Sequence, residues 1–224
     1  MKKQKNENVS YLSEVLDKLK EHKMAMVGLV VLIVEILMVV FLPMILKLDP
    51  YTSDYTAFSA APGGAHILGT DAIGRDVFAR LMYGGRTSLL VGFVSTLISC
   101  VIGVPLGLVA GYARGKAEAV IMRIADMMLA FPGLVLALAV AGIMGASIKN
   151  AIIAIVVVSW TKYARLARSL VMKIRDRDYV SAAIVTGSKT PYMLFRYMLP
   201  NALPTLIITA ATDIGSMMLE LAAM

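Results

Sequence analysis

The chain has 224 residues, of which 58% are hydrophobic, and it carries a net charge of +7. Because soluble domains are about 45–50% apolar, this composition predicts a membrane protein rather than a soluble domain. The basic residues are spread between apolar stretches, which argues against a nucleic-acid-binding surface. One cysteine and two histidines without metal-site spacing predict neither a disulfide framework nor a metal site.

Five apolar stretches are long enough to cross a bilayer as helices, which takes about 20 residues each. They are residues 24–46, 89–113, 125–145, 148–167 and 202–224. The predicted fold is an all-α membrane bundle at residues 24–224, preceded by an N-terminal arm at residues 1–23. The first stretch is long and has no cleavage site of small residues, so it is interpreted as a retained anchor.

The distribution of basic residues favours one orientation. With the N-terminus in the cytoplasm, 17 Lys and Arg residues fall inside and 5 outside, as the positive-inside rule expects. Residues 47–88 then form an outer loop, and residues 173–200 form a cytoplasmic segment. The last span ends at Met224 without a polar tail, so we expect a truncated form of a six-span protein with both termini inside.

Four glycines, each four residues after the last, mark one face of the second span. They are Gly103, Gly107, Gly111 and Gly115. In lipid, helices gain little from hydrophobic association, so such a ridge predicts close contact with another helix. Pro105 and Pro132 each remove a backbone donor and predict kinks in their helices.

Carboxylates within apolar stretches are the candidate path residues, because each costs about 2–3 kcal/mol on insertion scales unless paired or hydrated. Asp126 follows Arg123 by three residues, which favours a structural ion pair. Asp213 lies near the middle of its span, so it either lines a polar translocation path or makes a buried hydrogen bond between helices. Glu35 has no evident partner in sequence and is the second path candidate, with its role undecided.

No catalytic or nucleotide-binding motif occurs. The stretch GYARGKAEA is nearest to a phosphate-binding loop, but three residues separate its glycines where four are needed. It also has Ala117 where Ser or Thr must hold magnesium. The chain is therefore not expected to be an enzyme or to bind a cofactor.

The stretch Asp178–Pro200 is a half-polar interruption between two apolar spans. Residues 178–186 have helical spacing of small and apolar residues, and Gly187 follows as a helix stop. Thr190 can cap a second short helix with Pro191 at its first position, and the final proline closes it. Two short helices joined by a glycine bend outside the bilayer predict a docking surface for a partner.

This stretch resembles the cytoplasmic loop of ABC importer membrane subunits that reads Glu-Ala-Ala, three residues, Gly, nine residues, Ile, one residue, Leu-Pro. The matching positions are Ser181, Ala182, Ala183, Gly187, Tyr197, Leu199 and Pro200. Ser181 replaces the glutamate and Tyr197 the isoleucine. The resemblance implies that these positions, with Tyr179, couple the chain to a cytoplasmic ATPase.

A second resemblance begins at His66. The stretch HILGTDAIGRDVFARLMYGGRTSLLVG is similar to the segment after the first span in permeases of the dipeptide, oligopeptide and nickel branch. The stretches ADMMLAFP, YARLARSLV and LPNALP are also similar to that branch, and ATDIGSMMLELAAM slightly favours its nickel-type members. The implied outer-loop motif consists of Gly69, Thr70, Asp71, Gly74, Arg75 and Asp76.

The outer-loop motif has two interpretations. Thr70 or Asp71 can cap a short outer helix in which Asp76 and Arg80 form an i,i+4 pair. Either the motif is a turn held by its own salt bridge, or it contacts a solute-binding protein.

Together these stretches imply a type I ABC importer permease in the bacterial inner membrane, with five of six spans present here. The implied partners are a second homologous permease, two cytoplasmic ATPase subunits that bind ATP and magnesium, an extracytoplasmic solute-binding protein and the lipid bilayer. The implied cargo is short peptides or nickel or a nickel chelate, moved by ATP-driven alternating access. The alternatives are an ATPase-independent ion channel or carrier that uses Glu35 and Asp213, and a membrane scaffold or sensor.

Overall fold

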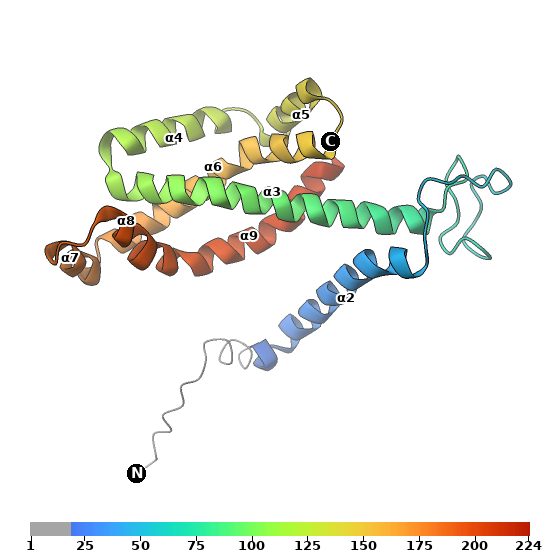
Figure 1. Cartoon of the computed structure of the whole chain (residues 1–224), viewed down its shortest axis with the longest axis horizontal. Helices are drawn as coiled ribbons and strands as arrows, with labels where there is room; N and C mark the ends of the chain where they lie inside the picture. Colours follow the sequence, from blue (N-terminus) through green and yellow to red (C-terminus); the bar gives the residue numbers. More distant parts are fainter. Residues whose placement is uncertain (1–18) are drawn as a thin grey trace, which may run out of the picture. The chain divides into compact units, whose positions relative to one another are not determined.

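The computed structural model describes residues 19–224, so most of the predicted N-terminal arm lies outside the described residues. The described part is helical apart from turns and one long loop, as predicted for an all-α protein (Figure 1). It divides into two compact units, one ending at Arg86 and the other beginning at Thr87. Helix α3 (Val77–Ala113) runs through the boundary.

The first unit contains helix α2 (Lys23–Ile45), which matches the first predicted span. Its side chains are apolar on all sides and nearly all exposed, as suits a helix surrounded by lipid. Glu35 is exposed on this helix and makes no hydrogen bond or ion pair with any described residue. The structure therefore gives Glu35 no partner that would mark it as part of a path.

Two glycines allow the loop after α2 to fold back on itself. Gly69 has φ +76° and Gly74 has φ +77°, a left-handed conformation that favours glycine. A Cβ atom on Gly69 would lie 2.2 Å from the carbonyl oxygen of Ala60, and one on Gly74 would lie 2.2 Å from that of Asp54. Both motif glycines are thus required by conformation and by space.

Asp71 organises the turn that follows. Its carboxylate accepts hydrogen bonds from the backbone N–H groups of Ile73 and Arg75 and from Nε of Arg75, the last at 2.9 Å. Arg80 also pairs with it. The backbone N–H of Arg75, with these other donors, lowers the pKa of Asp71 to about 2. Asp71 therefore stabilises a turn and does not cap a helix.

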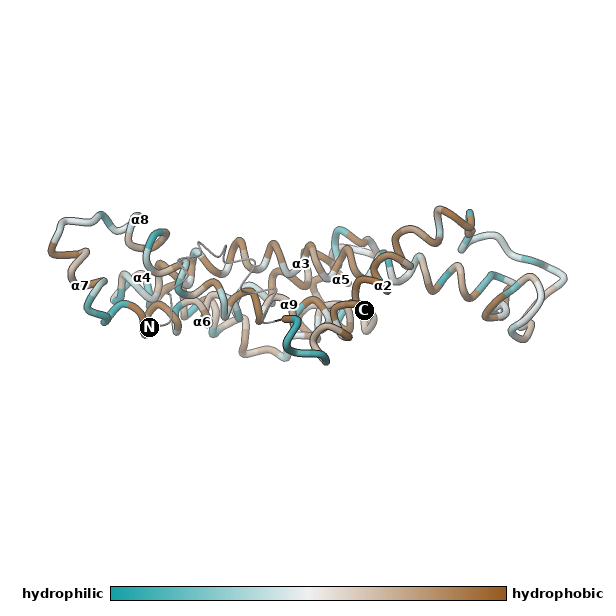
Figure 2. The backbone as a smooth tube through the Cα atoms, turned by 90° about the horizontal axis from the view of Figure 1, so that it is seen from below, coloured by the Kyte–Doolittle hydropathy of each residue, from teal (hydrophilic) through white to brown (hydrophobic). Residues whose placement is uncertain are grey.

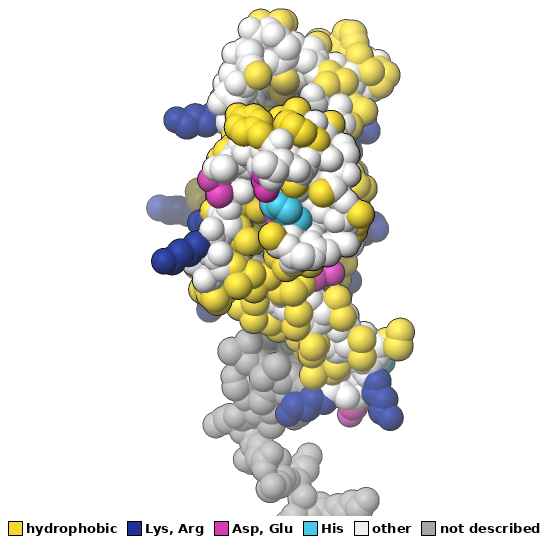
Figure 3. All heavy atoms as spheres, turned by 90° about the vertical axis from the view of Figure 1, so that its right-hand side faces the viewer, with side chains coloured by type: hydrophobic (Ala, Val, Ile, Leu, Met, Phe, Trp, Pro, Cys, Tyr) yellow, Lys and Arg dark blue, Asp and Glu magenta, His cyan; other side chains and the backbone are white. Residues whose placement is uncertain are grey.

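Asp76 is the residue that caps the next helix. Its Oδ1 accepts the backbone N–H of Ala79 at 2.8 Å, which places it just before the first residue of α3. Its Oδ2 lies 2.8 Å from Nδ1 of His66, and Asp54 lies 3.7 Å from the other ring nitrogen. Figure 3 faces this loop and shows a histidine and acidic side chains together on its surface. The predicted Asp76–Arg80 pair and the separate short outer helix are both wrong.

Helix α3 begins before the predicted start at residue 89 and has 37 residues. At 1.5 Å per residue it is about 55 Å long, well beyond the hydrocarbon core of about 30 Å. Figure 2 shows hydrophobic residues along most of its length. The whole helix is therefore too long to lie in lipid, and the early start comes from the cap at Asp76.

In the second unit α3 lies against α6 (Ile148–Arg175), and the glycine ridge makes this contact. A Cβ on Gly103 would lie 2.3 Å from the carbonyl oxygen of Trp160, and one on Gly107 would lie 2.3 Å from that of Ala164. Gly111 meets the α6 backbone and Val171 in the same way. Close helix packing is thus confirmed for three glycines, but Gly115 has φ +67° and begins the next helix instead.

The third predicted span is not one straight helix. It is divided into α4 (Gly115–Leu129) and α5 (Gly133–Met144), which are bent by 85° at a break that contains Pro132. The residue before a proline is disfavoured in the helical region, which explains the break. Both helices pack against α6, and so does α9 (Leu199–Ala222).

The predicted count of five spans is not confirmed. Among the described residues, α2, α3 and the run Thr190–Ala222 are long and apolar enough to cross a membrane, and the bent α4–α5 pair would make a fourth. Helix α6 continues beyond the predicted span at residues 148–167, and its second half carries several charged residues. That half makes α6 less apolar than the other spans.

The α3–α6 contact predicts a steric effect of a single methyl group. Gly107→Ala should destabilise the protein by about 1–3 kcal/mol, because the new Cβ would collide with the α6 backbone. Gly215→Ala is the matched control, since a Cβ there meets nothing within 4 Å. Thermal unfolding of the purified protein in detergent measures both, and equal melting temperatures for the two variants would contradict the close packing.

The loop predicts a pH effect. The hydrogen bond to Asp76 raises the pKa of His66 above its ordinary 6.5, so this bond stabilises the loop fully below that value and less as pH rises through the folded pKa. Hydrogen exchange of the loop amides, corrected for intrinsic rates, should show protection that is full below pH 6.5 and falls as pH rises through the raised pKa of His66. His66→Gln should flatten this profile, and an unchanged profile in that variant would be the contrary result.

Candidate functional site

The predicted coupling segment begins with helix α7 (Asp178–Val185), which follows α6 after a two-residue turn. Its inner face is formed by Val180 and Ala183, which are buried in the main apolar cluster of the second unit. This cluster also contains Met193 and Met198 from the following turns. The segment is therefore anchored to the bundle and is not a free loop.

Gly187 ends α7, as predicted from the sequence. It has φ +82°, and its N–H donates to the carbonyl of Ile184 while the N–H of Ser188 donates to that of Ala183. This pair of bonds is the Schellman motif, which satisfies the last carbonyls of a helix. A Cβ at Gly187 would meet nothing within 4 Å, so conformation and not space requires glycine here.

The outer face of α7 is exposed and partly apolar. Ser181 and Ala182 lie on it, and beside them the side chains of Tyr179, Ile184 and Val185 are 40%, 51% and 87% exposed. Exposed polar and apolar side chains thus lie together on one face of this short helix. We call these five residues the α7 outer face.

The second helix of the segment differs from the prediction. Thr190 is the first residue of α8 (Thr190–Met193) and makes no side-chain cap, although Pro191 lies in the first turn as expected. Pro200 does not close this helix, because the chain continues through the π-helical turn η1 (Leu194–Met198) directly into α9. Leu199 and Pro200 are the first two residues of α9. Pro200 has no N–H to donate to the preceding turn, and the π turn accommodates this loss.

Tyr197 connects the two parts of the segment. Its ring centroid lies 6.3 Å from that of Tyr179 on α7 and 5.8 Å from that of Tyr192 on α8. Such aromatic pairs add about 0.5–1.5 kcal/mol beyond the area they bury. The tyrosine at the isoleucine position of the motif therefore still serves as a packing residue.

Asp213 of α9 is buried, and it accepts hydrogen bonds from two α6 side chains. Nζ of Lys162 lies 2.5 Å from its Oδ1, and the hydroxyl of Tyr163 donates to its Oδ2 at 2.8 Å. The carboxylate also lines a cavity of about 170 Å³. The structure thus contains the buried hydrogen bond between helices, at the wall of a cavity. The sequence analysis predicted neither of these two partners of Asp213. The one signal for them was Lys162, a charged residue within the apolar stretch at residues 148–167.

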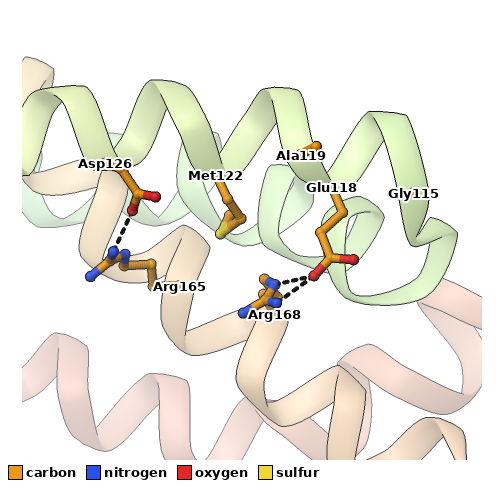
Figure 4. A pocket seen from close by; sticks show the side chains of 7 residues that line it. All are labelled: Gly115, Glu118, Ala119, Met122, Asp126, Arg165 and Arg168. Atoms are coloured by element: carbon orange, nitrogen blue, oxygen red, sulfur yellow. Dashed lines mark hydrogen bonds and ion pairs between the residues drawn. The ribbon is translucent and has the colours of Figure 1, made fainter.

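The carboxylates of α4 also pair with α6. Asp126 pairs with Arg165 and not with Arg123, because its side chain points across to the neighbouring helix. Glu118 accepts hydrogen bonds from Nε of Arg168 at 2.8 Å and from a second nitrogen of that guanidinium. Figure 4 shows these two pairs at a cavity of about 690 Å³, with Met122 between them.

Comparison with known proteins identifies the family. The family model described as "Binding-protein-dependent transport system inner membrane component" matches residues 103–224, and "N-terminal TM domain of oligopeptide transport permease C" matches residues 10–62.

Curated relatives extend these matches over nearly the whole chain. The dipeptide transport system permease protein of Alkalihalophilus pseudofirmus is 38% identical over 96% of this chain and 71% of its own length. The corresponding protein of Haemophilus influenzae is 39% identical over 92% of this chain and 72% of its own. The oligopeptide transport system permease protein of Bacillus subtilis is 31% identical over 90% and 66%.

The names of these three relatives refer to peptides, so they give no support to the preference for the nickel branch. The first family model covers more than half of the chain, and the two dipeptide permeases align with more than nine tenths of it. Both findings agree with the helical membrane fold. The chain therefore belongs to the family of binding-protein-dependent transport system inner membrane components.

Proposed function

We propose that this chain is the permease subunit of an ABC importer that moves short peptides across the bacterial inner membrane. The observation that carries the proposal is the α7 outer face, an exposed apolar surface on a helix whose other side is buried in the bundle. Peptides are preferred to nickel as cargo because the relatives named above are peptide permeases.

In this proposal the α7 outer face binds a cytoplasmic ATPase subunit. Val180 and Ala183 on the opposite side of α7 contact the main cluster, so a displacement of α7 is transmitted to the bundle. Helix α6 leads away from α7 as one continuous helix of 28 residues, about 42 Å long. Closure of two ATPase subunits on ATP and magnesium would tip the bundle as a rigid body, which gives alternating access.

The proposed topology places the N-terminus and α7 in the cytoplasm. Helices α2, α3, the α4–α5 pair, α6 and α9 are then five spans. The charged half of α6 is compatible with a membrane position because Lys162, Arg165 and Arg168 are each paired with a carboxylate. The loop at residues 46–76 faces outward and contacts the solute-binding protein, while a second permease completes the path.

An autonomous ion channel or carrier is a weaker proposal. Asp213 already accepts hydrogen bonds from Lys162 and Tyr163, so it is not a free ion ligand. Glu35 is exposed on a helix that buries almost none of its side chains. A scaffold or sensor would also expose α7, but it would bind its partner without any uptake of substrate.

Gly187 tests the coupling role of the segment. Gly187→Leu should reduce peptide uptake by at least about fivefold, because a non-glycine residue in the left-handed region costs about 1–2 kcal/mol and would displace α7. ATP hydrolysis by the reconstituted complex should persist. Gly187→Asn is the matched control, since asparagine tolerates this conformation, and its uptake should stay near the wild-type rate. Wild-type uptake in the leucine variant would contradict the proposal.

Single cysteines test the proposed orientation. Val185→Cys and Tyr51→Cys, each in a Cys100→Ser background, replace side chains that are 87% and 82% exposed. A membrane-impermeant maleimide should label residue 51 in cells with a permeabilised outer envelope, and residue 185 only in inside-out vesicles from which the ATPase subunits have been removed. Labelling of residue 185 from outside the cell would overturn the orientation.

A further inference from the structure

Three basic residues of α6 follow one another at intervals of three, and each pairs with a carboxylate from another helix. Lys162 pairs with Asp213 of α9, and Arg165 and Arg168 pair with α4. We call these three residues the α6 ladder. Residues three apart are neighbours on a helix surface, so the ladder forms a continuous charged stripe.

The ladder is paired but still accessible. The side chains of Lys162 and Arg165 are 57% and 52% exposed in the chain. Charged side chains within a membrane bundle face water or protein and not lipid, because burial in hydrocarbon costs several kcal/mol. The side of α6 that carries the ladder therefore faces an aqueous space or a protein neighbour.

Two cavities follow the ladder. The cavity of about 170 Å³ is lined by Lys162 and by Leu129 of α4, and the cavity of about 690 Å³ is lined by Arg165, Arg168 and Asp126. Leu129 and Asp126 are three residues apart on α4, so the two cavities lie next to each other along α4 and α6. Figure 4 shows the arginines of the larger cavity reaching from α6 toward α4.

The smaller cavity contains groups with unused binding capacity. Lys162 has three N–H donors, of which its ion pair with Asp213 uses one. Glu220 of α9 lines the same cavity, and its carboxylate makes no hydrogen bond or ion pair with any described residue. Ser159 and Ser216 add hydroxyl groups to the wall. A cation and a carboxylate thus both remain available in one small space.

We propose that this cavity binds the charged ends of a short zwitterionic peptide, with Lys162 holding the carboxylate and Glu220 the ammonium. The inference rests on the proposed peptide import and names the residues that recognise its substrate within the permease. Arg165 and Arg168 lie on the same side of α6 as Lys162 and line the larger cavity next to it. A volume of about 170 Å³ suits a ligand as small as a dipeptide and excludes a folded chain.

Uptake of matched probes tests the proposal in the complete importer. The probes are labelled Ala-Ala and its C-terminal amide, which lacks the negative charge. Lys162→Met should lower uptake of Ala-Ala by about tenfold, the effect of one lost charge-assisted hydrogen bond, and uptake of the amide much less. Comparing variant with wild type for each probe cancels any preference of the binding protein. Lys149→Met, an exposed lysine at the start of the same helix, should change neither rate.

A second measurement does not depend on transport. Ser216→Cys in a Cys100→Ser background places a thiol on the cavity wall. Millimolar Ala-Ala should slow its reaction with a water-soluble maleimide, while the amide and N-acetyl-Ala-Ala should not. Glu220→Gln should abolish the difference between Ala-Ala and the N-acetyl probe.

The two proposals fail in different ways. If the wild-type importer takes up none of the probes, peptide import fails, whereas thiol protection still reports on the cavity. If Lys162→Met lowers the uptake of both probes equally, and Ala-Ala does not slow the reaction of the introduced thiol, then Lys162 only holds α9 against α6 and the inference is wrong. If Lys162→Met does not accumulate in the membrane, the protection assay alone decides.

Discussion

The approach of α3 to the backbone of α6 is the contact on which the second unit depends. At Gly103 and Gly107 a single methyl group would stand 2.3 Å from an α6 carbonyl oxygen, so the two helices touch through their backbones. Such contacts replace the hydrophobic driving force that is missing between helices in lipid. Helix α6 also packs against α4, α5 and α9, and the side that α3 occupies sets which α6 side chains face these neighbours.

Helix α6 therefore has two different sides with two different tasks. Ala164 and Ala167 are completely buried where α3 approaches, and their small size permits the close contact. The α6 ladder lies on the exposed side and pairs with carboxylates of α4 and α9, in addition to the apolar packing of α9 in the main cluster. The Arg165–Asp126 pair is half-exposed on both sides, and such exposed pairs contribute little stability, about 0–1 kcal/mol. Lys162 and Arg165 are more than half exposed despite their ion pairs, so the proposed binding of a ligand does not require them to leave the bundle.

Local signals in the sequence predicted local structure well. The stop at Gly187 and three of the four ridge glycines follow from backbone conformation and spacing, whereas Gly115 begins the next helix. The partners of Asp126 and Asp213 could not be predicted, because the residues that bind them lie 39 and 51 positions away in the chain. Asp126 lies near Arg123 in sequence, but it pairs with Arg165 because α6 packs beside α4. The break at Pro132 was predicted only as a kink, since a proline alone does not fix the size of a bend.

The continuity of α8, η1 and α9 determines how a displacement of α7 would reach the bundle. A second helix closed at Pro200 would have left α7 and α8 as a separate module connected to α9 by a flexible end. Instead α8, η1 and α9 are continuous, and Met193 and Met198 are buried in the same cluster as Val180 of α7. Both ends of α7 are thus joined to long helices, α6 before it and α9 after it. In the proposed mechanism, a force on the α7 outer face would act on the two helices that supply Lys162 and Asp213, and so would reach the interior cavity.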